Sequence, residues 1–380
     1  MVEEWIAQDV HTGQNCAVQI RGQEVGVTPA SGDAPHALFI SQGWVDLQVN
    51  GFAGYDINAP DLAVDQVRAV TARLWQEGVA AWCPTVVTAA SDQIAHSLRV
   101  IDQACRADPQ VEASIPGIHL EGPYLSAADG ARGVHPAAHI HAPDWEEFLR
   151  WQAAAGGRIR ILTLAPELPG ALEFIQAVVQ SGVIVALGHT RASTATIRAA
   201  VEAGARMSTH LGNGIEAVLP RHPNPIWDQL AEDQLSASLI FDGFHLPASV
   251  MQVMLRAKGA PRVILVSDAS TLARLAPGIY DTPLGGKVQL HPNGRLSMFG
   301  TEYLAGSASS LKDGVENAVR LAGCTLPEAV SLVSTHPANL LGWRQHSHTL
   351  FTFDPRQNQC VIVGVCINRQ LVYRNLTWKA

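Results

Sequence analysis

Four residues with the chemistry of metal ligands or proton-transfer groups each follow directly after a short, mainly apolar run. Glu121 follows GIHL, His189 follows VALG, His210 follows RMST and Asp268 follows RVILVS. Carboxylates and imidazoles bind divalent cations such as zinc, and a cation held by three side chains keeps a position open for water. Two imidazoles and two carboxylates in such equivalent places therefore have the composition of a metal-assisted hydrolase.

Each of these residues also has an ordinary interpretation when it is taken alone. A single histidine after a strand is more often a hydrogen-bonded loop residue than a ligand. Asp268 could cap a helix that begins near Ser270, and Glu121 could belong to a turn with the following Gly-Pro. His119 lies two residues before Glu121, so on a strand both point the same way and form a conceivable ligand pair. The four strand-end placements together favour a site over these interpretations.

Short apolar runs that alternate with helical patterns predict the elements that position these residues. Ser193 is a plausible N-cap for one helix and Gly204 a plausible end. Continuous apolar strands that alternate with helices indicate a parallel sheet buried on both faces. Seven or eight such units over about 300 residues fit a (β/α)8 TIM-like barrel, in which chemistry is found where strands end. The runs are 78–82, 115–120, 159–163, 183–187, 207–209 and 262–266.

The two ends of the chain differ from its middle, because they contain short β-type runs separated by turn residues and no helical patterns between them. An Asn368-Arg369 turn separates the last two runs. Either end alone is too short for a core of its own, so we expect the ends to pair into one small β-sandwich domain. The runs are 17–21, 24–27, 350–353, 361–367 and 371–373. The predicted division is 1–42 for the first part of the small domain, 43–342 for the barrel and 343–380 for the second part of the small domain.

Composition excludes several classes of protein. The chain has 380 residues, a net charge of −8, 47% hydrophobic and 16% charged residues, which suits a large core and excludes disorder. An acidic chain without a Lys/Arg cluster argues against nucleic-acid and anionic-membrane partners, and no apolar run is long enough for a membrane span. The N-terminus lacks a signal-peptide pattern, and the six cysteines form no CxxC pair. We therefore expect free thiols and a cytoplasmic protein.

At the level of whole motifs, the sequence resembles the amidohydrolase superfamily and, within it, the N-acetylglucosamine-6-phosphate deacetylase family. HLEGP together with DGxH and SDA is fairly specific for the deacetylase branch. The matching segments extend in order over nearly the whole predicted barrel. They are GWVDLQVNGFAGYDIN (43–58), GIHLEGPYL (117–125), RGVHP (132–136), LGHT (187–190), THLGNG (209–214), IFDGFHLP (240–247), LVSDA (265–269) and LAGSA (304–308).

The resemblance implies that Glu121, His189 and His210 hold one divalent metal ion per subunit. We expect zinc first, and Fe, Mn or Co would also fit such a ligand set. Many members of the superfamily hold a second metal with an HxH motif, where this chain has Gln48 and Asn50. Amides are poor ligands for a soft or borderline cation, so we predict that the second-metal position is vacant.

The resemblance also assigns roles around the substrate. Asp268 would be the general acid/base, which accepts a proton from water activated by the metal and later gives it to the departing amine. In the family an arginine at the position of Arg221 reaches the phosphate bound by a neighbouring subunit, which implies a homodimer. The implied substrate contacts are His135, Asn213, Gly214, Arg221, His245, Leu304, Ala305 and Gly306.

The predicted reaction is hydrolysis of the N-acetyl amide of N-acetylglucosamine 6-phosphate, which yields glucosamine 6-phosphate and acetate. The segment 210–233 departs from the family's pattern, with Gly214 for an alanine, Ile215 for a methionine and RHPN (221–224) for a glycine-containing turn. This difference keeps alternatives open: an amidohydrolase for an unphosphorylated N-acyl sugar, an N-acyl amino acid or a cyclic amide. A non-catalytic scaffold on the same barrel is a further alternative, against which the intact Glu121, His189, His210 and Asp268 argue.

Overall fold

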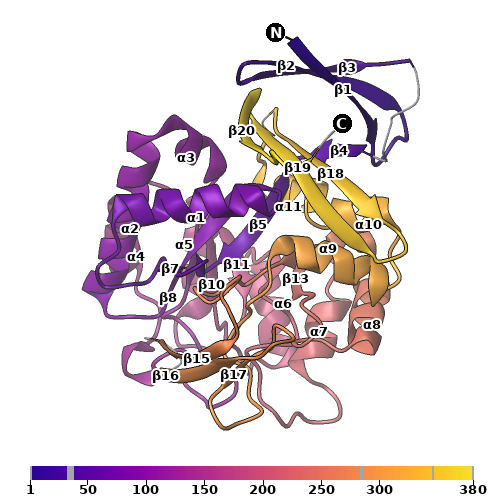
Figure 1. The fold of residues 1–380 in the computed structure, drawn as a ribbon. Coiled ribbons are helices and arrows are strands. Elements are labelled where there is room, and N and C mark those ends of the chain that lie inside the picture. The colour runs from indigo at the N-terminus through magenta and orange to yellow at the C-terminus, as the bar shows by residue number, and fades with distance from the viewer. Residues whose placement is uncertain (1, 32–37, 283–285, 345, 379–380) are drawn as a thin grey trace.

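Two barrels of different size make up the protein, as the computed structural model shows (Figure 1). The structure describes residues 2–31, 38–282, 286–344 and 346–378. The larger barrel is built from parallel strands with helices outside, and the smaller one from strands of both chain ends. The chain leaves the small barrel near residue 42 and returns to it near residue 348.

The large barrel contains eight parallel strands that are hydrogen-bonded in chain order. A bridge between Val49 and Ala269 links the first strand to the segment after the last one, so the sheet almost closes. Nearly all strand residues are buried, as expected for parallel strands that are covered on both faces. The predicted (β/α)8 TIM-like fold is therefore confirmed. The strands are β5 (Trp44–Val49), β8 (Val79–Val87), β9 (Ile118–Glu121), β10 (Ile159–Leu164), β11 (Ile184–Leu187), β12 (Met207–Ser208), β13 (Ser236–Ile240) and β14 (Val263–Val266).

Helices surround this barrel and pack their apolar faces against the strands. Helix α6 begins after Ser193, whose hydroxyl accepts a hydrogen bond from the backbone N–H of Thr196, and the chain turns at Gly204 with φ 117°. Both predicted boundaries of this helix agree with the structure to within two residues. The helices are α1 (Val64–Gln76), α2 (Ser91–Ala107), α3 (Pro109–Ser114), α4 (Trp145–Ala154), α5 (Ala171–Gln180), α6 (Thr194–Glu202), α7 (Pro225–Ala231), α8 (Ala248–Lys258), α9 (Leu311–Arg320), α10 (Leu326–Ser331) and α11 (Thr335–Leu341), with short 3₁₀ turns η2 (Ala137–His139) and η3 (Ala260–Arg262).

The small barrel combines both ends of the chain, as predicted, but its shape differs from the expected sandwich. Its sheet runs in the order β1-β2-β3-β20-β19-β18-β4, and a parallel pairing of β1 with β4 closes it. Because both edges of the sheet pair with each other, the strands form one closed barrel instead of two packed sheets. The strands are β1 (Val2–Asp9), β2 (Asn15–Arg21), β3 (Glu24–Pro29), β4 (Leu38–Gln42), β18 (His348–Asp354), β19 (Gln359–Ile367) and β20 (Gln370–Arg374).

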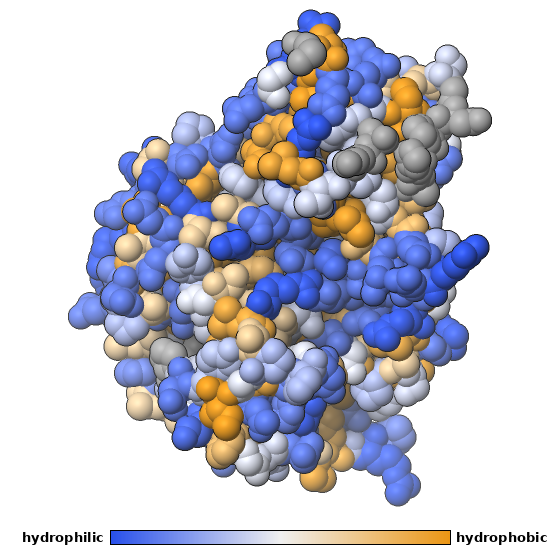
Figure 2. All heavy atoms as spheres, in the orientation of Figure 1, coloured by the Kyte–Doolittle hydropathy of each residue, from blue (hydrophilic) through white to orange (hydrophobic). Residues whose placement is uncertain are grey.

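Each barrel has a core of its own. Trp5, Val18, Ile40, Leu350 and Val363 belong to the apolar cluster inside the small barrel, which is separate from the main cluster around the large barrel. The outer face drawn in Figure 2 is predominantly hydrophilic, with apolar residues in separate spots. Among the described residues, no helix is both long and apolar enough to span a bilayer.

Two small sheets lie beside the mouth of the large barrel, and the sequence did not predict them. A two-stranded sheet follows β5 directly, and a three-stranded antiparallel sheet lies between β14 and α9. Side chains of the larger of these sheets reach the pocket at the barrel mouth, through Thr282, Val288 and Leu296. The strands are β6 (Gly51–Phe52), β7 (Tyr55–Asp56), β15 (Gly278–Thr282), β16 (Gly286–Leu290) and β17 (Leu296–Met298).

Candidate active site

The four residues singled out by their chemistry stand at the carboxyl ends of barrel strands. Glu121 is the last residue of β9, whereas His189, His210 and Asp268 each lie two residues beyond the end of their strand. These three have positive φ angles of 50°, 28° and 48°, which non-glycine residues rarely adopt. Such backbone strain tends to occur at functional sites, where the surrounding structure holds it. The same unusual conformation therefore recurs in three loops of one barrel mouth.

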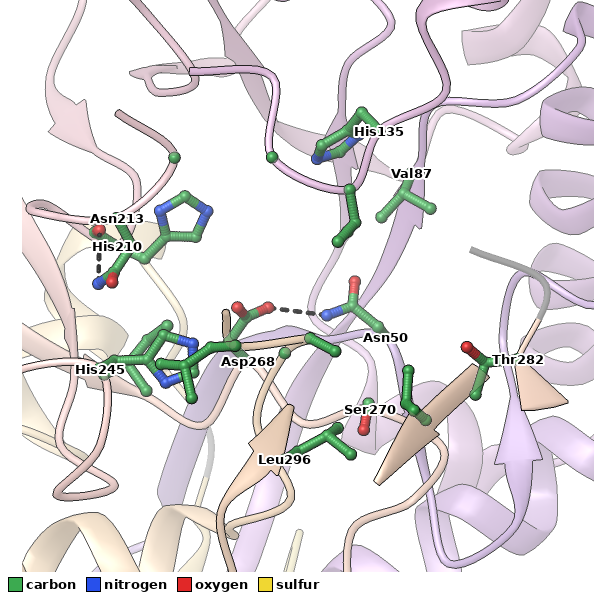
Figure 3. Close-up of a pocket in the computed structure, with 18 of the residues that line it drawn as sticks. Asn50, Val87, His135, His210, Asn213, His245, Asp268, Ser270, Thr282 and Leu296 are labelled. Carbon is green, nitrogen blue, oxygen red and sulfur yellow. Dashed lines mark hydrogen bonds between the residues drawn. The ribbon is translucent and has the colours of Figure 1, made fainter. Parts of the chain in front are cut away.

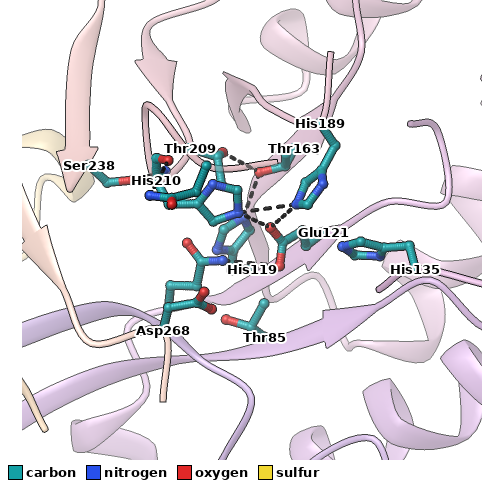
Figure 4. A network of polar contacts seen from close by, with 12 residues as sticks. Thr85, His119, Glu121, His135, Thr163, His189, Thr209, His210, Ser238 and Asp268 are labelled. Carbon is teal, nitrogen blue, oxygen red and sulfur yellow. Dashed lines mark hydrogen bonds and ion pairs between the residues drawn. The ribbon is translucent and has the colours of Figure 1, made fainter. Parts of the chain in front are cut away.

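Glu121, His189 and His210 converge on one point (Figure 4). Glu121 Oε1 lies 3.2 Å from His189 Nε2 and 3.0 Å from His210 Nε2, and the two imidazole nitrogens are 3.1 Å apart. All three residues are buried. Two ring nitrogens and a carboxylate oxygen at such distances form a compact set of donors for a cation.

The outer hydrogen bond of His189 agrees with a metal-binding role, and both rings turn Nε2 toward the cluster. His189 Nδ1 donates to the carbonyl oxygen of Ala131 at 2.8 Å, so its Nε2 presents a lone pair to the cluster. His210 Nδ1 has no hydrogen-bond partner, and the ring contacts Glu121 and His189 through Nε2. Burial would raise the pKa of Glu121, but its close contacts with the rings of His189 and His210 hold that pKa well below its ordinary value. An ionised carboxylate and two imidazoles fit a divalent metal of the zinc type.

His119 does not join this cluster. Its Nδ1 contacts the carbonyl oxygen of Leu47 at 3.1 Å, and its Nε2 contacts Thr163 Oγ1 at 2.7 Å. Both ring nitrogens are therefore used inside the barrel, and burial lowers the pKa of His119 to about 4. The conceivable ligand pair of His119 and Glu121 does not form, because this neutral ring instead connects β9 to β5 and β10.

Asp268 faces the same pocket from the end of β14, beside the cluster (Figure 3). Asn50 Nδ2 donates to Asp268 Oδ1 at 2.7 Å. Burial raises the pKa of Asp268 to about 6, with His210 opposing this shift and Glu121 adding to it. A carboxyl group with such a pKa can both accept and return a proton near neutral pH.

Gln48 is a residue of β5, and Asn50 directly follows the last residue of that strand. Gln48 is fully buried, and its Nε2 donates to Glu121 Oε2 at 3.0 Å. Asn50 lines the pocket and contacts Asp268 as described. Both amides thus point their NH₂ groups at carboxylates of the site.

A pocket of about 390 Å³ opens over the cluster, a size suited to a small organic substrate. It contains every residue that the sequence suggested for substrate contact except Arg221. Figure 3 shows His135, Asn213 and His245 around this pocket. The suggested residues that line it are His135, Asn213, Gly214, His245, Leu304, Ala305 and Gly306, together with the three cluster residues, Asn50 and Asp268.

Gly214 stands where the family's pattern has alanine, and the local backbone explains the glycine. It adopts φ 58°, and a Cβ atom there would lie 2.7 Å from His189 Nδ1. A larger residue would have to displace the imidazole or the loop. The glycine therefore permits the loop after β12 to lie against the ring of His189.

Sequence reasoning missed Asp242, which holds His245. Asp242 Oδ2 lies 2.6 Å from His245 Nδ1, and its Oδ1 accepts the backbone N–H groups of Phe244 and His245. Burial would raise the pKa of Asp242, but these contacts with His245 bring it below its ordinary value. The signal was present in the DGFH segment, because an aspartate two or three residues before a polar residue often forms such a turn.

Arg221 does not reach the pocket of its own chain. It is exposed, in the segment between β12 and α7. The residues that line the pocket within the described part of the chain include no arginine or lysine.

Comparisons with known proteins agree on one enzyme type. No protein-family model matches the chain. It is 35% identical over 318 residues to an N-acetylgalactosamine-6-phosphate deacetylase of Escherichia coli O157:H7, which covers 83% of this chain and 81% of that protein. It is 30% identical over 311 residues to the N-acetylglucosamine-6-phosphate deacetylase of Bacillus subtilis, with coverages of 81% and 77%. The structure of a variant N-acetyl-D-glucosamine-6-phosphate deacetylase of Mycobacterium smegmatis, in complex with N-acetyl-D-glucosamine-6-phosphate, superimposes with a TM-score of 0.84 at 25% identity, over 98% of this chain and 99% of that one.

Proposed function

The chain belongs to the N-acetylglucosamine-6-phosphate deacetylase family of the amidohydrolase superfamily, and from this premise we propose that it converts N-acetylglucosamine 6-phosphate and water into glucosamine 6-phosphate and acetate. The observation that carries the proposal is the convergence of Glu121, His189 and His210 beside Asp268 in one pocket. This set matches the needs of amide hydrolysis and would have no use in a scaffold.

Glu121, His189 and His210 would hold one divalent metal ion per subunit, with zinc as the first candidate. When bound, such an ion supplies a Lewis acid that polarises the amide carbonyl and makes water more acidic. The buried, ionised carboxylate of Glu121 offsets part of its charge.

Asp268 moves the proton. Its carboxylate accepts a proton from the attacking water and returns it to the amine nitrogen when the C–N bond breaks. His135 stays neutral, because burial and the nearby His189 lower its pKa to about 3. Its Nδ1 lies 2.9 Å from Thr88 Oγ1. If the Thr88 hydroxyl donates its hydrogen to Nδ1, the ring hydrogen is on Nε2, where it can donate to the amide oxygen of the substrate.

The same pocket would bind the sugar phosphate. His245, held by Asp242, and Asn213 with the backbone at Gly214 would contribute polar groups, while Leu304, Ala305 and Gly306 would border the sugar. These residues leave the phosphate without a guanidinium from the same chain. Arg221 of a second subunit would supply one, which makes the functional unit a homodimer.

A second candidate substrate is N-acetylgalactosamine 6-phosphate. It is favoured by sequence identity. The chain is 35% identical to the N-acetylgalactosamine-6-phosphate deacetylase of Escherichia coli O157:H7 and 30% identical to the N-acetylglucosamine-6-phosphate deacetylase of Bacillus subtilis. The two sugars differ only in the orientation of one hydroxyl group, so the same metal site and Asp268 serve both.

Two further proposals concern the organisation and location of the chain. We place the domain boundaries at 42/43 and 342/343, which is supported by β4 ending at Gln42 and α11 ending at Leu341. We also propose a cytoplasmic location, supported by the six cysteines, which are all free thiols.

Acetate release from metal-loaded protein tests the proposed function. N-acetylglucosamine 6-phosphate, its galactosamine counterpart and free N-acetylglucosamine are compared at equal concentrations. We expect a strong preference for one phosphorylated sugar, and Asp268→Asn should lower kcat by about 10²–10⁴-fold while the fold and bound metal stay. Equal turnover of phosphorylated and free sugars would overturn the 6-phosphate assignment, and no turnover of any of them would overturn the deacetylase.

A further inference from the structure

Two neutral amides, one on β5 and one directly after it, each hold one carboxylate of the candidate active site. Gln48 Nε2 donates to Glu121 Oε2 at 3.0 Å, and Asn50 Nδ2 donates to Asp268 Oδ1 at 2.7 Å. Gln48 lies on β5 and Asn50 directly follows the last residue of that strand, Val49, so both amides reach the site from the same strand end. We propose that they are positioning residues: Gln48 orients the metal ligand Glu121, and Asn50 orients the proton carrier Asp268.

The orientation of the amides follows from what their partners can accept. An ionised carboxylate only accepts hydrogen bonds, so the NH₂ end of each amide must face it. The opposite atoms, Gln48 Oε1 and Asn50 Oδ1, are buried and have no hydrogen-bond partner in the described structure. The side-chain hydrogen bonds of Gln48 and Asn50 in the described structure both go to carboxylates of the site and not to backbone groups.

Each hydrogen bond engages one oxygen of a carboxylate, so the two oxygens of that carboxylate have different roles. Glu121 Oε2 is held by Gln48, and Glu121 Oε1 alone faces the imidazoles of His189 and His210. Asp268 Oδ1 is held by Asn50, which leaves Oδ2 to exchange the proton. Fixing one oxygen in this way orients the other without adding a charge beside the cluster.

The choice of amides also bears on how many cations the site holds. A second cation that bridges to the first through Glu121 would need the oxygen that Gln48 occupies. A neutral donor stabilises the ionised Glu121 without competing with the bound cation for it. Outer hydrogen bonds of this kind typically change metal affinity by about tenfold to a hundredfold when they are removed.

This inference rests on the proposed function for the role of Asp268, but the role of Gln48 can be measured without substrate. The zinc affinity of the chelator-treated protein is determined by competition with a chromogenic chelator for wild type, Gln48→Met and Gln48→Leu. Methionine keeps the length of the side chain and lacks the donor. We expect both variants to bind zinc about tenfold to a hundredfold more weakly than wild type. Wild type should bind one zinc ion per chain.

Gln229→Met is the matched control. Gln229 is also buried, its Nε2 donates to the carbonyl oxygen of Pro225, and its Oε1 has no partner, but it contacts no residue of the site. The control should lower the melting temperature about as much as Gln48→Met and leave zinc affinity unchanged. Zinc affinity of Gln48→Met within twofold of wild type would overturn the role of Gln48, whatever its stability.

Asn50→Leu tests the other half of the proposal, with Asn50→Ser as a smaller replacement that carries less risk of misfolding. We expect zinc affinity within about threefold of wild type, kcat lowered at least tenfold, KM little changed, and the acidic limb of the pH profile moved to higher pH. An unchanged kcat and pH profile in both variants would overturn the role of Asn50. If wild type hydrolyses no amino sugar while Gln48→Met still loses zinc affinity, the proposed function fails and the role of Gln48 stands.

Discussion

Asp242 Oδ2 lies 2.6 Å from Nδ1 of His245, and the same carboxylate accepts the backbone N–H of that histidine. Asp242 therefore fixes both the ring and the backbone of a residue that lines the pocket. The hydrogen bond at Nδ1 leaves Nε2 of His245 as the ring atom that can bind a ligand.

Asp242→Asn should therefore weaken recognition of the phosphate. We expect KM for the 6-phosphorylated sugar to rise about tenfold, since hydrogen bonds to charged groups contribute about 1.5–3 kcal/mol, with a smaller change in kcat. Steady-state kinetics with phosphorylated and free N-acetyl sugar measure the effect. Asp233→Asn serves as the control, because Asp233 is exposed and is not among the residues that line the pocket. An equal rise in KM for both sugars would argue against a phosphate-specific role.

Mixing two inactive variants distinguishes an arginine acting within its own chain from one acting across a dimer. Arg221→Ala lacks the proposed phosphate contact, and Asp268→Asn lacks the proposed proton carrier. If Arg221 serves the neighbouring site, a mixed dimer contains one site with both groups, so a random mixture regains about a quarter of wild-type activity. Acetate release after unfolding and refolding the two variants together measures this recovery. Activity no higher than the sum of the separate variants would show that Arg221 does not act in trans.

Metal binding should stabilise the fold. Glu121, His189 and His210 bring three donor atoms within 4.8 Å of one another, an arrangement that exists only in the folded chain. A ligand present at a thousand times its Kd stabilises the native state by about 4 kcal/mol. We expect chelator-treated protein to melt at a lower temperature and zinc to restore the loss, measured by calorimetry. Magnesium, which prefers oxygen ligands, should restore little, and equal recovery with both ions would contradict the assigned ligand set.

Gly214→Ala should weaken metal binding through His189. The new Cβ would lie 2.7 Å from Nδ1 of His189, the atom that donates to Ala131. Displacing the ring disturbs this hydrogen bond and the direction of Nε2, and outer contacts of metal-ligating histidines change affinity by about tenfold or more. A zinc titration of the variant measures the change. Gly212→Ala is the control, because its Cβ would contact only the side chains of Met254 and Leu246; equal losses in both variants would assign the effect to loop strain instead.

The fold and the placement of the candidate site residues at strand ends were largely predictable, because they depend on local patterns. Apolar runs that end in Glu121, His189, His210 and Asp268 identify strands and strand ends without knowledge of pairing. Strand β13, with the sequence SASLI, was not among the predicted runs, since its two serines interrupt the apolar pattern. Ser238 accepts a hydrogen bond from the backbone N–H of His210. One of the serines that interrupt the apolar pattern therefore helps to position His210.

Features that depend on pairing between distant parts of the chain could not be predicted from the sequence. Closure of the small barrel needs β1 to pair with β4, and no local pattern shows which edges meet. Likewise, Gln48 and Asn50 could be identified as replacements of metal-binding histidines, but their contacts with Glu121 and Asp268 join residues 73 and 218 positions apart. The direction in which an amide donates becomes visible only when the partner is in place.

Asp46 should make the stability of the protein depend on pH. It is fully buried on β5, its Oδ1 accepts the backbone N–H groups of Gln48 and Ser267, and its Oδ2 has no partner. Burial raises its pKa to about 7, against the ordinary value of 3.8, while the hydrogen bonds from Ser267 oppose the shift. Because the folded state holds the proton more tightly than the unfolded state, the stabilisation is fully present below about pH 4 and is lost as pH rises to about 7.

Asp46→Asn removes this dependence, since an amide keeps one acceptor for the backbone and stays neutral at every pH. We expect the stability of wild type minus that of Asp46→Asn to fall between pH 4 and pH 7 and to level off above it, by about 1.4 kcal/mol for each unit by which the two pKa values differ. Denaturant unfolding of both proteins in the presence of chelator, at constant ionic strength, gives this difference. A difference that stays constant from pH 4 to pH 8 would mean that Asp46 titrates alike in the folded and unfolded states, and that its unpaired oxygen is solvated inside the barrel.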